Sequence, residues 1–349
     1  MSVPLAELPV PLLEWYRDNA RKLPWRDDPT PYHVLLSEIM LQQTRVAAVL
    51  GYYERFLSAA PTVADLAALD GDELMKLWQG LGYYNRARNL QNAARRIMED
   101  YGGEFPQDYG ALRALPGVGD YTAGAIASIA FGLPVPAVDG NVLRVVSRLT
   151  GDGGDVALES TRRRVRADLA AVIPTADAGR FNQALMELGA TVCLPNGAPL
   201  CDRCPARGFC RAYSEGRTGE LPVKSPPKPR RIEERDVYLI FHGGRVALRR
   251  RPDKGLLAGL WEYPNALAGT EPDWRVPVTA TGESRAARHI FTHVEWRMTA
   301  RVYLACGDAL PEGWVWADRG DLARWYALPN AFQGFEETVR RALAGGVAP

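Results

Sequence analysis

The sequence contains none of the long apolar stretches that would place a chain in a membrane. No segment approaches the ~18 uninterrupted apolar residues that a spanning helix needs. Residues 1–17 show no basic segment followed by an apolar run, which is the pattern of a secretory signal. We therefore expect a soluble cytoplasmic protein with no membrane partner.

A surplus of positive charge is missing as well. The net charge is +1, and residues 1–215 hold 22 Lys and Arg against 25 Asp and Glu, a balance of −3. Composition alone therefore gives no sign of nucleic-acid binding, and a DNA-binding protein with these totals has to gather its cations on one face. Arg86 with Arg88, and Arg203, Arg207 and Arg211 beside the cysteines, are candidates for such a face.

The periodicity of apolar residues changes once along the chain. From residue 12 to about 188 they recur at three- and four-residue spacing, which predicts helices. Beyond a segment rich in Pro and charge, residues 236–251 predict two short strands around Gly243–Gly244, and 289–306 a longer strand. Residues 333–344 predict a closing helix. A length of 349 residues favours two domains, predicted as follows: an all-α domain at 1–215, a linker at 216–235 and an α+β domain at 236–349.

Four of the five cysteines crowd into one loop. Cys193, Cys201, Cys204 and Cys210 stand as C-x7-C-x2-C-x5-C with no histidine near. In a reducing compartment this pattern favours a metal centre over disulfides. A zinc site usually pairs two C-x2-C knuckles or adds histidine, whereas four thiolates in one loop suit a [4Fe–4S] cluster. The spacing by itself favours the cluster and leaves zinc and inert thiols open; Cys306 is expected to be a small core residue.

Residues 109–131 predict a helix, a glycine-rich hairpin and a second helix. The first helix has to stop at Pro116, and Gly117 and Gly119 permit a tight turn with outward backbone N–H groups. Asp120 or Thr122 can cap the next helix, whose N-terminus adds N–H donors. The assembly, with Leu115 and Val118 beside the glycines, is suited to a DNA phosphate, although an ordinary helical turn explains the motif about as well on its own.

Three features together resemble the helix-hairpin-helix DNA glycosylase superfamily, over roughly residues 10–212. They are the L-P-G-V-G hairpin (115–119), Asp139 in VDGNVLR (138–144) and the four-cysteine loop. Two branches of that superfamily carry an iron–sulfur cluster, the endonuclease III type and the MutY type of adenine glycosylase. The resemblance therefore implies an all-α domain with a [4Fe–4S] cluster on the four cysteines. One departure is that seven residues, rather than the usual six, separate Cys193 from Cys201.

Four features make the chain similar to the MutY branch. SEIMLQQT (37–44) matches the motif that places a glutamate, Glu38, before a Gln-Gln-Thr wedge, and Tyr121 stands where the endonuclease III branch has its Schiff-base lysine. Residues 77–223 contain no lysine. GLGYYNRARNL (80–90) matches the segment whose tyrosine, here Tyr83, lies beside the damaged guanine, and the second domain is itself a MutY addition.

The resemblance implies an adenine DNA glycosylase of base excision repair that flips a mispaired adenine out of the duplex and hydrolyses its bond to deoxyribose. Glu38 would protonate N7 of adenine and later help activate water, and Asp139 would stabilise the cationic sugar, with Tyr121 and Asn141 orienting them. Such a reaction needs one protonated and one ionised carboxyl group. Helical spacing independently predicts that Glu38 is buried, although a single glutamate on a helix is usually a solvated charge.

Other positions follow from the resemblance alone. Trp25, Arg26, Leu41 and Glu187 would line the adenine pocket, and Gln43, Thr44 and Leu81 would probe the opposite base. Each is equally explained by core packing or helix surface.

The second domain contains GLLAGLWEYP (255–264), which resembles part of a Nudix hydrolase domain, as in MutT. The glutamate series of the metal-binding Nudix box is absent. We therefore expect the fold without the pyrophosphatase chemistry. In the MutY family this domain helps to recognise 8-oxoguanine through a loop that Phe291, Thr292 and His293 resemble. The expected partner is duplex DNA with an 8-oxoguanine:A or G:A mispair, bound by a monomer.

Three alternatives remain at this stage. The nearest is an endonuclease III-like pyrimidine glycosylase with strand-cleaving lyase activity. The others are a non-catalytic, cluster-bearing DNA-binding protein and an active Nudix hydrolase.

Overall fold

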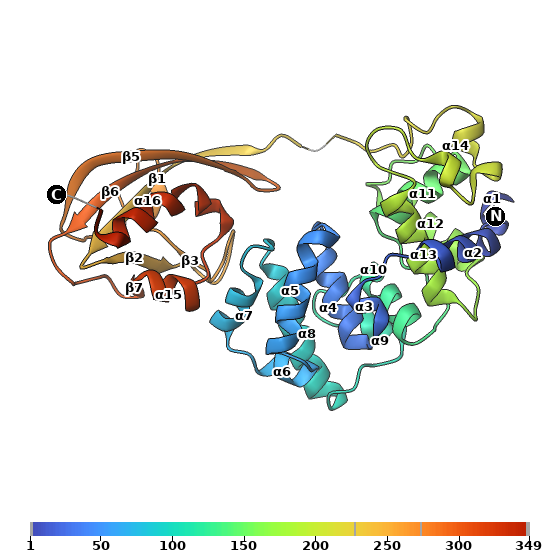
Figure 1. Cartoon of the computed structure of the whole chain (residues 1–349), viewed down its shortest axis with the longest axis horizontal. Helices are drawn as coiled ribbons and strands as arrows, with labels where there is room; N and C mark the ends of the chain where they lie inside the picture. The colour runs from blue at the N-terminus through green and yellow to red at the C-terminus, as the bar shows by residue number, and fades with distance from the viewer. Residues whose placement is uncertain (1–2, 227, 273, 347–349) are drawn as a thin grey trace. The chain divides into compact units, whose positions relative to one another are not determined.

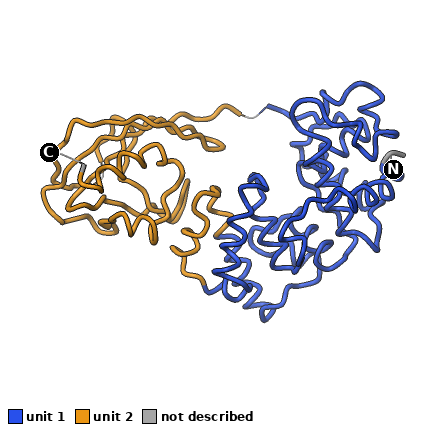
Figure 2. Tube along the Cα trace, viewed as in Figure 1, with its two compact units in different colours: residues 1–68, 88–226 blue, residues 69–87, 227–349 orange. Residues whose placement is uncertain are grey.

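The computed structural model describes residues 3–226, 228–272 and 274–346, so the outermost residues of both predicted domains lie outside it (Figure 1). The chain forms two compact units (Figure 2). Unit 1 comprises residues 1–68 and 88–226, and unit 2 comprises residues 69–87 and 227–349.

The units differ from the predicted domain ranges in two places. Residues 69–87 belong to unit 2, although their helical pattern matches that of unit 1. Strand β1 (Arg231–His242) begins inside the predicted linker, because Arg231 to Phe241 pair in parallel with Val294 to Leu304 of β6 (Val294–Ala305). The partners in both cases are distant in sequence, so no local pattern announces them.

Unit 1 is helical, as predicted from its apolar spacing. Its core joins apolar side chains of α1, α2, α11, α12 and α13, and the cysteine loop packs against that core. The helices that lie wholly or partly in unit 1 are α1 (Val3–Ala6), α2 (Pro9–Asn19), α3 (Pro24–Asp27), α4 (Pro31–Leu41), α5 (Val46–Ala59), α6 (Val63–Ala68), α8 (Asn85–Tyr101), α9 (Tyr109–Arg113), α10 (Asp120–Ala125) with the π-helix η1 (Ile126–Ala130), α11 (Gly140–Thr150), α12 (Glu159–Ala170), α13 (Ala178–Thr191), the short 3-10 turns η2 (Cys201–Arg203) and η3 (Arg207–Phe209), and α14 (Arg211–Ser214).

Helix α4 carries Glu38, the first predicted catalytic residue, and its limits are explained by the local sequence. The Thr30 hydroxyl accepts the backbone N–H of His33 at 3.2 Å, and Pro31 occupies the first helical turn, where its missing N–H costs nothing. The helix ends at Leu41, and Gln43 adopts a left-handed φ of 59° before α5 begins. Nearly every residue from Tyr32 to Met40 is buried, so α4 is a core helix rather than a surface one.

Helices α11 and α13 approach each other more closely than side chains would allow. A Cβ atom added to Gly189 would lie 2.6 Å from Cβ of Asn141. Glycine is therefore required at position 189 for the two helices to pack in this way.

The predicted hairpin lies between α9 and α10. Gly117 has a φ of 74°, and a Cβ there would lie 2.5 Å from Cβ of Asn89 in α8. The predicted side-chain cap is wrong: Gly119 is the N-cap of α10 and no side chain caps the helix. The Asp120 carboxylate instead pairs with Arg113 at 2.6 Å and Arg166 at 3.0 Å, two cations that attract it away from the backbone.

Unit 2 is built around a mixed sheet in the order β3-β2-β1-β6-β5, with β4 paired to β1 and β7 to β2. The predicted pair of strands around Gly243–Gly244 is confirmed as β1 and β2, and both glycines have the positive φ that a two-residue hairpin needs. The predicted β-type segment at 289–306 is confirmed by β6 and the end of β5, with residues 291–293 interrupting it between the two strands. The remaining strands are β2 (Arg245–Arg250), β3 (Trp261–Glu262), β4 (Asn265–Leu267), β5 (Val278–Ile290) and β7 (Trp314–Ala317).

One face of this sheet packs against the C-terminal helical turns (Figure 1). Phe332, Phe335 and Val339 contribute to the buried cluster with side chains of β1, β2 and β6. The predicted closing helix is confirmed as α16, and Cys306, predicted to be a core residue, is exposed just after β6. The helical elements of unit 2 are α7 (Gly71–Trp78), α15 (Arg319–Arg324), η4 (Asn330–Phe335), α16 (Glu336–Arg341) and η5 (Ala342–Gly346).

Within the described ranges, no helix combines the length and the apolar character needed to cross a membrane.

Candidate active site

Glu38 is a buried carboxyl group on α4, as the helical spacing predicts. The residue is only 6% exposed, and the Tyr121 hydroxyl of α10 donates a hydrogen bond to its Oε2. Burial raises the pKa of Glu38 to about 7, and the negative charge of Asp139 adds to the rise, while the Tyr121 hydrogen bond and Arg26 oppose it. Glu38 therefore holds a proton close to neutral pH.

Asp139 is the N-cap of α11 and lies in a different setting. Its Oδ1 accepts the backbone N–H of Val142 at 2.7 Å, and its Oδ2 accepts the Asn141 amide at 2.8 Å. Burial raises the pKa of Asp139, but both N–H donors and the positive end of α11 stabilise the anion. Of the two carboxyl groups, Asp139 is the one whose surroundings support a negative charge.

The two carboxyl groups line one cavity of about 570 Å³. A volume of this size is in the range of small-molecule sites in proteins. The structure brings together in it the following residues that the sequence singled out: Trp25, Arg26, Glu38, Leu41, Gln43, Thr44, Tyr121, Asp139, Asn141 and Glu187.

Glu187 and Arg26 form an ion pair in the cavity wall. Glu187 of α13 is fully buried and accepts Nη2 of Arg26 at 2.8 Å and Nε of Arg21 at 2.6 Å. Burial alone would raise the pKa of Glu187, but the two guanidinium groups outweigh it and hold the pKa below its usual value. Glu187 is therefore a wall residue with its charge already paired, not a second proton donor.

Sequence reasoning missed several residues of this cavity. Arg21 lies five positions before Arg26, between α2 and α3, and its role shows only through the contact with Glu187, far along the chain. Met186 places its sulfur 3.5 Å from the Tyr121 hydroxyl. Arg162 of α12 also lines the cavity, and no motif in the arginine-rich sequence of that helix marked it.

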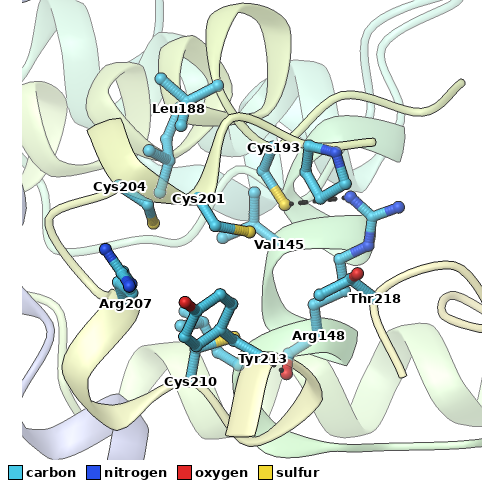
Figure 3. A pocket seen from close by; sticks show the side chains of 13 residues that line it. Val145, Arg148, Leu188, Cys193, Cys201, Cys204, Arg207, Cys210, Tyr213 and Thr218 are labelled. Atoms are coloured by element: carbon cyan, nitrogen blue, oxygen red, sulfur yellow. Dashed lines mark hydrogen bonds between the residues drawn. The ribbon is translucent and has the colours of Figure 1, made fainter. Parts of the chain in front are cut away.

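The four clustered cysteines line a second, much smaller cavity of about 30 Å³ in unit 1. Figure 3 shows their thiols facing a common space, with Arg148 beside Cys193. Nη1 of Arg148 donates to the Cys193 sulfur at 3.3 Å, and burial raises the pKa of Cys204 to about 12. Within the described part of the chain, no group of three or more His, Cys, Asp or Glu side chains is placed to hold a single metal ion.

Helix α11 connects the two cavities through side chains. Asn141, which holds Asp139, accepts Nη2 of Arg144 at 2.8 Å through its own oxygen. The same guanidinium donates from Nε to the backbone oxygen of Cys193 at 2.8 Å. A continuous series of hydrogen bonds therefore joins the Asp139 carboxylate to the backbone of the first clustered cysteine.

The hairpin residues and the predicted cations lie outside the larger cavity, and several of them are buried or paired. Leu115 and Val118 are buried, and their backbone N–H groups donate to the Leu112 and Leu115 carbonyls within the turn. Arg86 is only 8% exposed and donates to the Leu81 and Gly82 carbonyls, so it is a structural residue and not a surface cation. Arg207 pairs with Asp202 at 2.7 Å.

The residues predicted to read the opposite base lie partly in unit 2. Tyr83 is 49% exposed, and its hydroxyl lies 3.3 Å from Oγ1 of the exposed Thr292. His293 is exposed, Phe291 packs edge-on against Trp296, and Leu81 is buried. Tyr83 and Thr292 are thus brought together although 209 positions separate them.

Comparison with known proteins agrees with both units. Residues 36–174 match the family described as HhH-GPD superfamily base excision DNA repair protein, and residues 236–336 match the NUDIX domain family. Two solved structures, each 29% identical and covering 59% of this chain, resemble it: a thermostable thymine-DNA glycosylase (TM-score 0.54, 94% of that chain) and an endonuclease III in a non-covalent DNA complex (TM-score 0.50, 92% of that chain).

The family match, together with a buried carboxyl group that faces a cavity of about 570 Å³, identifies the class of protein as a DNA glycosylase of base excision repair. Over 97% of its length the chain is 35% identical to the adenine DNA glycosylase of Rattus norvegicus, of which it covers 80%. The chain belongs to the adenine DNA glycosylase family.

Proposed function

We propose that the protein removes adenine paired with 8-oxoguanine or guanine from duplex DNA by hydrolysing the N-glycosidic bond, without cutting the strand. The observation that carries the proposal is that Glu38 and Asp139 line one cavity in unlike surroundings. An adenine inside a duplex is out of reach, so the base enters this cavity by flipping out of the stack.

Glu38 is the general acid in this proposal. Its carboxyl group protonates N7 of the flipped adenine, which makes the base a better leaving group, and the resulting carboxylate then helps to activate water. The Tyr121 hydroxyl already occupies Oε2 as a donor, so the transferable proton resides on Oε1. A pKa near 7 suits a proton donor that works at neutral pH.

Asp139 is the anionic partner. Departure of the base leaves positive charge on the sugar, and a fixed carboxylate beside it stabilises that charge or bonds transiently to the sugar carbon. Val142 and Asn141 hold both oxygens of Asp139, so the carboxylate needs no rearrangement as the charge develops.

The absence of a suitably placed amine supports hydrolysis over lyase chemistry. Strand-cleaving glycosylases use a lysine that forms a Schiff base with the sugar, and Tyr121 stands at that position here. No lysine occurs among the described residues that line the cavity. This favours a glycosylase without lyase activity over the endonuclease III-like alternative.

We also propose that Cys193, Cys201, Cys204 and Cys210 hold a [4Fe–4S] cluster. Four thiols from one loop around a small, mostly apolar void suit such a group. When bound, the cluster would order the loop from Cys193 to Cys210. It takes no part in the steps assigned to Glu38 and Asp139.

The test uses purified protein on duplexes that place adenine opposite 8-oxoguanine, guanine, cytosine or thymine. We expect abasic sites, detected as alkali-dependent strand breaks, chiefly opposite 8-oxoguanine and guanine, and no covalent adduct on borohydride reduction. Strand cleavage without alkali, an efficient adduct, or release of pyrimidines would favour the endonuclease III-like alternative instead.

A further inference from the structure

The loop that carries Tyr83 is held in an uncommon backbone conformation. This probe loop, residues 79–84, joins α7 to α8 and contains three positive φ angles, 105° at Gly80, 69° at Gly82 and 49° at Tyr83. Only glycine adopts such angles freely, so Tyr83 needs support from its surroundings.

Part of that support comes from both ends of the loop itself. Nε1 of Trp78 donates to the Gly82 carbonyl at 3.0 Å, and Nη2 of Arg86 donates to the same carbonyl at 3.1 Å. These bonds fix the internal shape of the loop. They do not connect it to the sheet of unit 2.

Lys76, one turn before the loop, connects this segment to α15 and the residues that follow it. Its Nζ donates to Oε1 of Gln79 at 2.7 Å, to the Leu322 carbonyl at 2.8 Å and to the Tyr326 carbonyl at 3.4 Å. The ammonium group has three N–H donors, and these three acceptors are all uncharged. The Leu322 carbonyl belongs to the last turn of α15, where carbonyls lack helical partners and favour a cation.

Two amide side chains extend the connection along the loop. Gln79 donates to the Leu328 carbonyl at 3.2 Å, and Asn330 donates to the Gly80 carbonyl at 3.1 Å. The loop is therefore fixed to residues 322–330, while at its tip the Tyr83 hydroxyl lies 3.3 Å from Oγ1 of Thr292.

We propose that Lys76 is a positioning residue that fixes the probe loop to the sheet domain of unit 2, so that Tyr83 and Thr292 read the base opposite the adenine as one surface. The proposal rests on the proposed function, since it concerns how 8-oxoguanine is distinguished from guanine. It assigns that discrimination partly to a lysine whose ammonium group donates to three acceptors within the protein.

The test compares rates of adenine release under single-turnover conditions from 8-oxoguanine:A and G:A duplexes. In Lys76→Met the ratio of the two rates is expected to fall about tenfold or more, because a charged donor to three acceptors is lost, while the G:A rate changes less than about threefold. Lys76→Arg, which keeps a cationic donor, should largely restore the ratio. Lys254→Met, at an exposed lysine of the same unit, is the matched control and should leave both rates unchanged.

Asn330→Ala provides a second, milder variant that removes the bond to Gly80 without touching Lys76. It should lower the ratio in the same direction, and it carries the test if circular dichroism shows that Lys76→Met does not fold. A double-mutant cycle that combines Asn330→Ala with Thr292→Ala should show non-additive changes in this ratio, because both substitutions act on one surface.

The inference is overturned if Lys76→Met and Asn330→Ala keep the wild-type ratio, or if both rates fall equally, which would indicate a purely structural role. Failure of the wild-type protein to release adenine from either duplex would contradict the proposed function itself. The two failures are therefore distinguishable.

Discussion

The two cavities of unit 1 share the same pair of helices and differ in almost everything else. The larger one, about 570 Å³, is lined by carboxyl, amide and guanidinium groups among apolar side chains, and the smaller one, about 30 Å³, by thiols and apolar side chains with Arg148 and Arg207. Helices α11 and α13 contribute to both. A single pair of packed helices thus supports both the cavity proposed to receive the flipped base and the thiol cavity proposed to hold a cluster.

The largest effect is expected from Glu38→Gln, which tests whether a change in the larger cavity leaves the smaller one unaffected. Glu38→Gln removes the proposed proton donor and should lower the rate of adenine release about 10²–10⁴-fold. The iron content should not change, because Glu38 does not line the thiol cavity. Single-turnover kinetics and iron analysis on the same preparation check both statements, and the exposed Glu104→Gln is the control. Wild-type rates in Glu38→Gln would move the acid role to another group.

The complementary change acts on the smaller cavity. Cys204→Ala removes a thiol that packs against the core of unit 1 and should abolish cluster binding. Because binding of a structural metal group contributes to folding, we expect the free energy of unfolding to fall on the order of 4 kcal/mol. Iron analysis and urea unfolding measure the two effects. The exposed Cys306→Ala should change neither, and iron retained in Cys204→Ala would contradict the assignment.

The polar cavity should also make stability depend on pH. Glu38 ionises near pH 4.5 in the unfolded chain and about 7 in the folded protein, so the folded state binds the extra proton between these values. Stability therefore falls as pH rises through this window, by up to about 3 kcal/mol at ~1.4 kcal/mol per pKa unit. Urea unfolding at several pH values should show a smaller decline in Glu38→Gln. Equal declines in both proteins would contradict a raised pKa of Glu38.

The smallest expected effect concerns the connection between the cavities. Arg144→Gln breaks the bonds to Asn141 and to the Cys193 carbonyl. We expect about a tenfold loss of adenine release, since Asn141 then holds Asp139 less firmly, with iron retained. Single-turnover rates and iron content are the measurements. A variant that loses stability but not rate would show that the two cavities work independently.

The same comparison explains what the sequence could predict. The four clustered cysteines fall within one loop, so their spacing from Cys193 to Cys210 was enough to predict that the thiols lie together. The burial of Glu38 followed from helical spacing, because its neighbours on α4 are apolar. Local patterns also predicted the hairpin strands β1 and β2 and the helical character of unit 1.

The rest depends on partners that are remote in sequence. Arg21 lies at the cavity because it pairs with Glu187. Asp120 does not cap α10 as predicted, because its carboxylate pairs with Arg113 and Arg166. Residues 69–87 look like any helical segment of unit 1, and their place in unit 2 arises from contacts such as that of Lys76 with α15. Ion pairs and hydrogen bonds between residues so far apart form only once the chain has folded, so no periodic pattern in the sequence predicts them.

The contact between Gly189 and Asn141 lies where α11 and α13 meet, between the two cavities. A single methyl group at position 189 would act as a wedge there, pushing Asn141, and with it Asp139, away from α13 while changing no charge and no hydrogen-bonding group. We therefore expect sensitivity to variation at Gly189 as well as at the ionisable residues, because this glycine determines where the carboxylate proposed to stabilise the sugar cation lies.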